Sequence, residues 1–237
     1  MTFKGWTAAS ACALALSCAG AAQAQLYFRG DLGASISTNA NFGDNDPNNF
    51  LICGNAPCTS PGRFSDFGNT VVLDAGMGAR LSPNARIEAM LGYRGYELRA
   101  FDGGVPSTEF RANITSVSAM ANAYYDFDGR GWKPYLGLGI GTAQNKIDSL
   151  RFDDGFSFFG STPGGTHSGF AWSFMAGAGL PLSYDTTLDF GYRYIDLGKV
   201  EIPAGGAVTV AGVVTPPPYG GATGNLRAHE FTIGVRF

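Results

Sequence analysis

From Glu230 to the C-terminal Phe237, polar and apolar side chains alternate strictly along the chain. The polar positions are Glu230, Thr232, Gly234 and Arg236, and the apolar positions are Phe231, Ile233, Val235 and Phe237. A period of two is typical of a β-strand whose two faces meet unlike surroundings. Transmembrane β-barrels are built from such segments of about ten residues, separated by turns. Residues 226–237 are therefore predicted to form the closing strand of a barrel.

The same alternation recurs upstream and predicts an all-β chain. It gives eight strands, at residues 26–37, 70–81, 85–96, 113–127, 132–143, 169–181, 186–197 and 226–237. The connections 38–69, 97–112, 144–168 and 198–225 are long, whereas 82–84, 128–131 and 182–185 are short. Bacterial outer-membrane barrels have an even strand number, short periplasmic turns and longer extracellular loops. The prediction is an eight-stranded antiparallel transmembrane β-barrel with four long extracellular loops and three short periplasmic turns.

The N-terminal residues 1–24 have the pattern of a secretory signal peptide. Lys4 precedes an apolar run over 8–22, and Ala22-Gln23-Ala24 fits cleavage before Gln25. A lipoprotein leader would use Cys18, but Leu16 stands one place too late for a good lipobox. The barrel domain is accordingly expected to span residues 25–237.

Two cysteines, Cys53 and Cys58, remain after the leader, with four residues between them. In an exported chain this spacing favours a local disulfide. A metal site would need further ligands, and His167 and His229 are far away in sequence. No metal and no cofactor are expected.

Composition narrows the class further. No apolar window of about 18 residues follows the leader, which excludes a helical membrane protein. Charged residues make up 15% of the chain, against roughly 25% in ordinary soluble domains. The net charge is −3 and no basic patch is present, so nucleic acid is not expected as a partner.

The predicted barrel interior carries charges of both signs. They are Arg29, Arg80, Arg86, Arg94, Lys133, Arg193 and Arg236, against Asp31, Asp74, Glu88, Asp126, Asp189 and Glu230. Eight strands leave an interior just wide enough for side chains, and buried charges must be paired. The near balance of sign predicts a plug of ion pairs. The alternative is a charged conduit through the same groups.

Candidate chemistry outside the interior is sparse. His167-Ser168 lacks the spacing expected of a lipid-trimming barrel enzyme, and His229 and Glu230 face opposite sides of one strand. No catalytic residues are expected, so the chain is predicted not to be an enzyme. Three aromatic residues in the third long loop are candidates for contact with a host surface or lipid, although they could instead pack against neighbouring loops: Phe156, Phe158 and Phe159.

Four segments together resemble a known family: LYFRGDLGAS (26–35), NAYYDF (122–127) with KPYLGLGIG (133–141), LDFGYRYIDLG (188–198) and HEFTIGVRF (229–237). They are similar to alphaproteobacterial small outer-membrane proteins, called outer membrane immunogenic or porin-family proteins and akin to the OmpA membrane domain and the opacity adhesins. The cysteine-bearing first loop is not a feature associated with that family. The resemblance implies a Gram-negative outer-membrane location and both termini in the periplasm. It also implies that Phe237 belongs to the signal read by the barrel-assembly machinery.

The roles of that family are mixed, so the resemblance leaves function open. The expected role is structural or interactive, in envelope integrity or loop-mediated adhesion. Outer-membrane lipid, lipopolysaccharide and host surface molecules are the expected partners of a monomer. A narrow channel for small solutes is the alternative, and a lipid-modifying enzyme is a more distant third.

Overall fold

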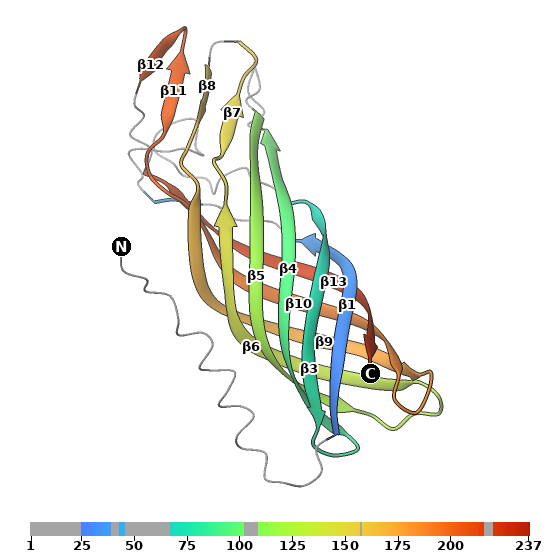
Figure 1. Cartoon of the computed structure of the whole chain (residues 1–237). Helices are drawn as coiled ribbons and strands as arrows, with labels where there is room; N and C mark the ends of the chain where they lie inside the picture. The colour runs from blue at the N-terminus through green and yellow to red at the C-terminus, as the bar shows by residue number, and fades with distance from the viewer. Residues whose placement is uncertain (1–24, 39–42, 46–66, 102–108, 157, 216–219) are drawn as a thin grey trace.

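A closed antiparallel sheet dominates the computed structural model, which describes residues 25–38, 43–45, 67–101, 109–156, 158–215 and 220–237 (Figure 1). The strands of the described part are β1 (Gln25–Ser37), β2 (Gly43–Asp44), β3 (Asn69–Arg80), β4 (Ala85–Phe101), β5 (Glu109–Asp126), β6 (Lys133–Ile147), β7 (Arg151–Asp153), β8 (Phe158–Ser161), β9 (Gly165–Pro181), β10 (Thr187–Ile202), β11 (Ala207–Val210), β12 (Val213–Thr215) and β13 (Ala222–Arg236). Within the same residues, no helix is long and apolar enough to cross a membrane.

Eight of these strands form a ring, in the order β1, β3, β4, β5, β6, β9, β10 and β13. The ring closes where β1 pairs with β13, from Arg29 opposite Arg236 to Ser37 opposite Ala228. The terminal residue extends this seam, because Phe237 donates its backbone N–H to the Phe28 carbonyl oxygen at 3.0 Å and accepts from Phe28 N at 2.8 Å. The predicted eight-stranded antiparallel barrel is confirmed.

Short turns join the strands at the end of the barrel that carries the C-terminus, as Figure 1 shows. At the first of them, the Leu81 and Ser82 amides donate to the Ala85 carbonyl oxygen at 2.9 and 3.1 Å. The Ser82 hydroxyl oxygen accepts from Ala85 N at 3.0 Å. Pro83 presets one φ angle of this turn, which reverses the chain within four residues, 81–84.

Apolar side chains cover the outside of the barrel wall along its membrane-spanning part. Aromatic rings pair at two levels of this band. Phe28 lies 6.1 Å from Phe237, and Tyr125 lies 5.0 Å from Phe127, near the short turns. Trp172 lies 5.6 Å from Tyr194 towards the opposite end. Aromatic belts at both borders of an apolar band are typical of transmembrane barrels.

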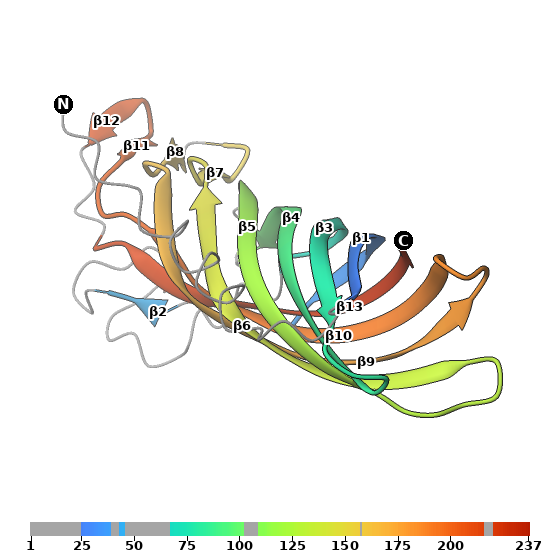
Figure 2. The same cartoon turned by 60° about the horizontal axis from the view of Figure 1, so that its bottom comes forward.

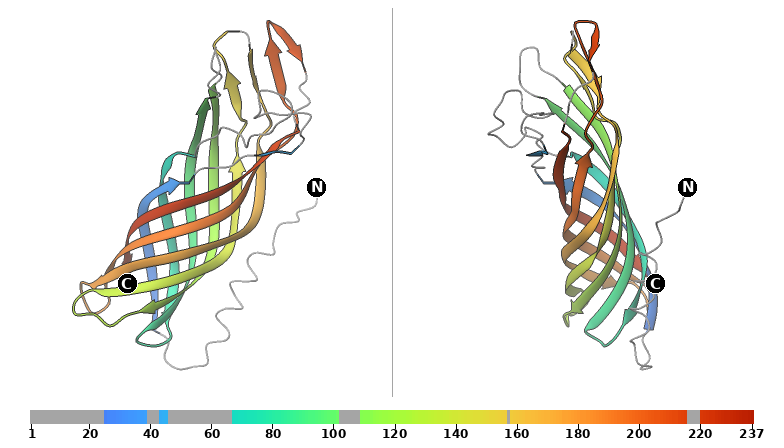
Figure 3. Two further views of the ribbon diagram at one scale, coloured as in Figure 1. Left: turned by 180° about the vertical axis from the view of Figure 1, so that it is seen from behind. Right: turned by 90° about the vertical axis from the view of Figure 1, so that its left-hand side faces the viewer.

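The strands on the extracellular side are longer than the alternation predicts. β4 and β5 run through most of the predicted loop 97–112, and two short hairpins, β7–β8 and β11–β12, occupy parts of the loops 144–168 and 198–225. Paired strands β4, β5, β7, β8, β11 and β12 form a continuous extension, which we call the extracellular sheet. Figures 2 and 3 show the two hairpins gathered at the end opposite the short turns.

A reversal of polarity explains why these extensions escape prediction. Leu98, Ile114 and Ile147 point inward and are fully buried, in strands whose membrane portions turn polar residues inward. Their outward neighbours Asn113 and Lys146 are exposed. Above the membrane the outer face meets water, so alternation continues with the apolar face inside.

Inward glycines let neighbouring strands approach closely, and Gly76 gives a test. A Cβ there would meet the Ala89 carbonyl oxygen and lie 2.6 Å from the Met90 sulfur, whereas a Cβ at Gly30 would have open space within 4 Å. We expect Gly76→Ala to lower the free energy of unfolding by about 1–3 kcal/mol through overpacking. Gly30→Ala, one residue along from the position that pairs with Gly76, is the matched control and should leave it unchanged. Urea unfolding in lipid vesicles measures both, and equal stability would contradict this packing.

Candidate functional site: the barrel interior and the extracellular sheet

Eleven of the thirteen predicted interior charges lie buried inside the barrel: Arg29, Asp31, Asp74, Arg86, Glu88, Arg94, Asp126, Asp189, Arg193, Glu230 and Arg236. Arg80, the last residue of β3, is half-buried. The prediction is wrong for Lys133, which is exposed. It is the first residue of β6 and lies at the periplasmic mouth, where water solvates its ammonium group.

The upper group of charges joins four strands across the barrel. Arg94 Nε and Arg193 Nε each donate to the Glu230 carboxylate at 2.6 Å. Both guanidinium groups also contact Asp74, Arg94 at 3.4 Å and Arg193 more closely. Ser35 donates to Glu230 at 3.1 Å. Two cations therefore face two carboxylates, and the group is neutral as a whole.

The lower group lies nearer the short turns and carries one excess carboxylate. Arg29 contacts Asp31 at 2.8 Å and Glu88 at 3.3 Å, while Arg86 contacts Asp126 at 3.1 Å and also pairs with Glu88. Aromatic faces add to the pairing, since the Arg86 guanidinium carbon lies 3.8 Å from the centre of the Tyr124 ring and 4.7 Å from that of Tyr135. Arg236 and Asp189 form a separate pair, at 2.5 and 3.0 Å.

Little space remains between these groups. A cavity of about 20 Å³ lies among Met90, Asn122, Tyr124, Tyr135 and Met175 within the described interior. That volume admits about one water molecule. Asn122 Oδ1 and Ser173 Oγ are buried without a protein partner, which suits such a water.

Above the charges, buried apolar side chains close the extracellular end of the barrel. We call this cluster the apolar cap; its members are Phe67, Tyr96, Leu98, Ala112, Ile114, Met120, Ala143, Ile147, Leu150, Phe152, Ala171, Ile195, Leu197, Val200, Ile202, Ala222, Leu226 and Ala228. Phe67 enters from the segment before β3, and its backbone N–H donates to Ser37 Oγ at 2.9 Å. Sequence reasoning missed the cap, because a plug of ion pairs alone was expected. The signal was the inward apolar positions Leu98 and Ile147, beyond the predicted strand ends, and Ile114, near the start of the predicted strand 113–127.

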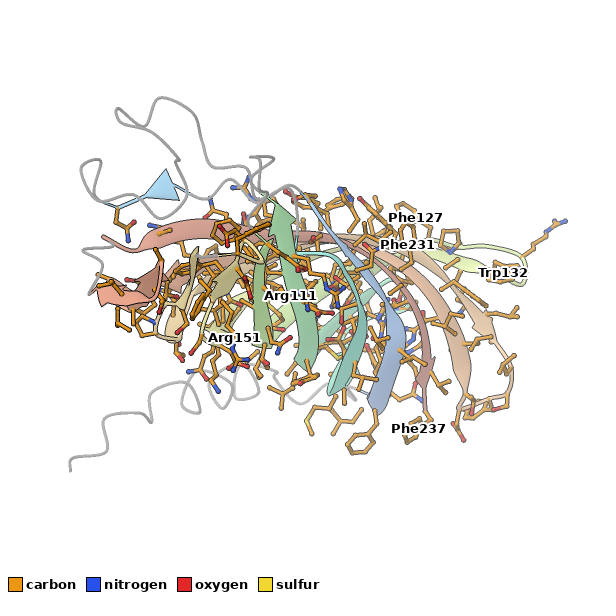
Figure 4. The ribbon with its side chains drawn as sticks, turned by 90° about the horizontal axis from the view of Figure 1, so that it is seen from above. Arg111, Phe127, Trp132, Arg151, Phe231 and Phe237 are labelled. Atoms are coloured by element: carbon orange, nitrogen blue, oxygen red, sulfur yellow. The ribbon has the colours of Figure 1, made fainter. Side chains whose placement is uncertain are left out.

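The outer face of the extracellular sheet carries three arginines in one row. Arg99 on β4 pairs with Arg111 on β5, which pairs with Arg151 on β7. Figure 4 shows Arg111 and Arg151 on neighbouring strands of this sheet. Like charges placed directly opposite each other destabilise a sheet. We call these residues the arginine row, and only their register reveals them.

Glutamates on the same strands offset part of this repulsion. Arg99 donates to Glu97 at 2.7 Å, and Arg111 donates to Glu109 at 2.6 Å. The hydrogen bonds from Arg111 lower the pKa of the exposed Glu109 carboxyl. The side chains of Arg99 and Arg111 remain more than half exposed, so both stay accessible to a partner.

The loop aromatics differ in exposure. Phe156 is 87% exposed and Phe159 is 48% exposed on the β7–β8 hairpin, so packing against neighbouring loops does not account for Phe156. Phe158 begins β8, and its side chain lies outside the described part. The signal peptide 1–24 and the predicted Cys53–Cys58 disulfide also lie outside the described residues and stay predictions.

The histidines have local partners. His167 Nδ1 lies 3.3 Å from Glu201, and His229 Nδ1 lies 2.7 Å from the Tyr192 hydroxyl. Ser168 accepts a hydrogen bond from Gln144 at 3.3 Å. Over the described residues, no group of three or more His, Cys, Asp or Glu side chains could hold a metal ion.

Residues 9–237 match the protein family described as the outer membrane protein beta-barrel domain. The chain belongs to this family. It is an outer-membrane β-barrel protein of the Gram-negative envelope, as the resemblance predicted.

Individual relatives agree with this assignment. Outer membrane protein PagN of Salmonella typhimurium is 26% identical over 202 residues, which cover 80% of this chain and 81% of that protein. An uncharacterized protein of Brucella abortus is 38% identical over 82 residues, or 33% of this chain and 29% of that protein. Outer membrane protein OprG from Pseudomonas aeruginosa superposes with a TM-score of 0.54 at 11% identity, over 90% of this chain and 95% of OprG. The likeness to OprG shows the shared fold.

The ion-pair network is open to a stability test at Glu230. Glu230→Gln removes the carboxylate that faces both Arg94 and Arg193. Because breaking a buried pair leaves charge uncompensated, we expect the free energy of unfolding to fall by about 3–5 kcal/mol. Glu97→Gln removes an exposed partner of Arg99 and should cost less than about 1 kcal/mol. Urea unfolding in vesicles compares them, and similar losses would contradict the role of the network.

Proposed function

We propose that this barrel is closed to ions and small solutes and acts as a structural and surface-interaction protein of the outer membrane. One observation carries the proposal: in the described part of the barrel, paired charges and buried apolar side chains occupy the interior. Ion pairs occupy the membrane portion, the apolar cap covers the extracellular end, and the described cavity between the charges measures about 20 Å³. With the lumen filled, the outer surfaces are what remains available to partners.

The extracellular sheet is the surface we assign to adhesion. Its end strand β12 exposes Val213 and Val214, at 62% and 68%, and is joined through β11 to the β7–β8 hairpin with its exposed Phe156. Exposed apolar side chains on the same sheet as exposed, partly paired arginines are typical of recognition surfaces. The arginine row favours a partner with negative charge, such as an acidic molecule on a host cell.

A narrow channel is the second candidate, favoured by the chain of eleven buried charges. Conduction would require water to replace ion pairs along the barrel and the apolar cap to open. Both changes expose buried groups at a cost in free energy.

Single-channel recording separates these two candidates. We expect the folded barrel, inserted into planar bilayers, to give no steady openings, because no continuous water path crosses the ion pairs. A difference in migration between the unheated and the heated protein on a denaturing gel serves as the control for folding. Reproducible unitary currents from the folded protein would overturn the closed-barrel proposal.

Binding to host cells tests the extracellular sheet. The triple variant Arg99→Gln, Arg111→Gln, Arg151→Gln keeps the sheet but removes the arginine row. We expect a severalfold loss of adhesion when bacteria displaying it are counted on cultured host cells. Lys146→Gln is the control, because Lys146 is an exposed cation on β6 outside the row, 3.5 Å from Asp148. Equal adhesion of wild type, triple variant and control would contradict the assigned surface.

A further inference from the structure

We propose that the outer wall formed by β9, β10, β13 and β1 holds a specific site for a phosphorylated glycolipid of the outer leaflet. The site has two parts, an apolar hollow for acyl chains and a polar cluster above it for the phosphate. In the left view of Figure 3, β13, β10 and β9 lie side by side, and β1 pairs with β13 at the edge of this group. The inference goes beyond the proposed function and does not depend on it.

The hollow lies on the membrane-facing surface and measures about 750 Å³. Its lining includes Val71, Ala176, Phe190, Tyr192, Phe231 and Ile233. Strand pairing explains the shape. One row of outward residues crosses the four strands in the order Ala176, Tyr192, Phe231 and Ala34. The two large rings therefore stand between two small alanines. Neighbouring lipid must fill this space, since apolar surface here faces the bilayer.

The polar cluster begins one row towards the extracellular side. His229 stands opposite Tyr194, and its Nδ1 lies 2.7 Å from the Tyr192 hydroxyl. Both tyrosine rings pack against the imidazole, at 5.9 and 5.3 Å between ring centres. An ordered histidine–tyrosine pair on the outside of the wall marks headgroup depth, where amphipathic rings prefer to lie.

Two cations stand immediately above this pair. Arg227 lies opposite Asp196 and donates to its carboxylate at 2.7 Å, and Lys199 lies on the next row, opposite Asn225. The Arg227 side chain is 47% exposed, whereas that of Asp196 is 13% exposed. Arg227 therefore keeps donors free for a phosphate, and Asp196 holds it in place. Asp196 and Glu201 balance these two cations; Glu201 lies two residues beyond Lys199 on the same face and contacts His167 at 3.3 Å.

The vertical spacing matches one lipid molecule. Arg227 precedes Phe231 by four residues, which is about 13 Å along a strand and about 10 Å after the strand tilt is allowed for. Acyl chains would fill the hollow while a phosphate on the sugar reaches Arg227 and Lys199. The polar cluster lies towards the extracellular end of these strands, which selects the outer leaflet and hence its phosphorylated glycolipid.

Titration with lipid A, intact and dephosphorylated, tests the site. Full barrel purified from outer membranes in detergent is mixed with each lipid, and native mass spectrometry measures the bound fraction. Arg227→Gln should weaken binding of intact lipid A about tenfold, the scale of one charge-assisted hydrogen bond, and leave binding of the dephosphorylated form unchanged. Ala176→Phe fills the hollow from outside the wall and should weaken both forms alike.

Lys146→Gln is the matched control, since it removes an exposed, carboxylate-paired cation of β6 that belongs to neither part of the site. It should bind lipid A as wild type does. Equal losses for Arg227→Gln and Lys146→Gln would overturn the proposal by reducing it to general charge attraction. Equal competition by phosphatidylglycerol would overturn the glycolipid assignment. Gel migration of each unheated variant confirms that it is folded before the titration.

Discussion

The wall of this barrel meets two solvents, and its construction follows from that constraint. Along the membrane portion the outside faces hydrocarbon, so apolar residues point outward and charges point in. Beyond the membrane the same strands face water, and the alternation reverses: Leu98, Ile114 and Ile147 turn inward and form much of the apolar cap. Strand and register do not change at the boundary. What changes is which face carries the polar side chains and which the apolar ones. The backbone hydrogen bonds of the closed ladder continue unchanged across the boundary.

Inward charges then determine what the lumen can do. Arginines and carboxylates removed from water are tolerated only when paired, and eight strands leave too little room for water to replace their partners. Asp74 and Arg193 meet across the barrel although 119 residues separate them in sequence. Such contacts tie β3, β4, β10 and β13 together through the interior, in addition to the ladder that joins neighbours. A network that fixes strand register in this way also obstructs the path that a channel would need.

Much of this architecture could be predicted from sequence, and the failures have a common physical origin. Period-two alternation gave the ring and placed eleven buried charges correctly on the inner face. It missed the extracellular ends of β4, β5 and β10. Strands were recognised by apolar residues on the outward face, and beyond the membrane the outward face is polar because it meets water. Lys133 was wrongly placed in the interior because the alternation along β6 puts it on the inward face. It is the first residue of that strand and lies at the periplasmic mouth of the barrel, where it is exposed. The arginine row and the pairing of Asp74 depend on register between strands distant in sequence, which composition and periodicity do not determine.

In the closed barrel that we propose, the surfaces available to partners lie on the outside, part of them in water and part in lipid. The part in water presents charge on a sheet, where Glu97 and Glu109 offset part of the repulsion within the arginine row and an acidic partner would offset more of it. The part in lipid presents aromatic rings and an apolar hollow. The hydrogen-bonded pair of His229 and Tyr192 would be unfavourable deep in the hydrocarbon, whereas the headgroup region suits it. Arg227 stands where these two regions meet. Its partner Asp196 lies on the neighbouring strand, so the cation is held at the one level of the wall where a lipid phosphate can reach it.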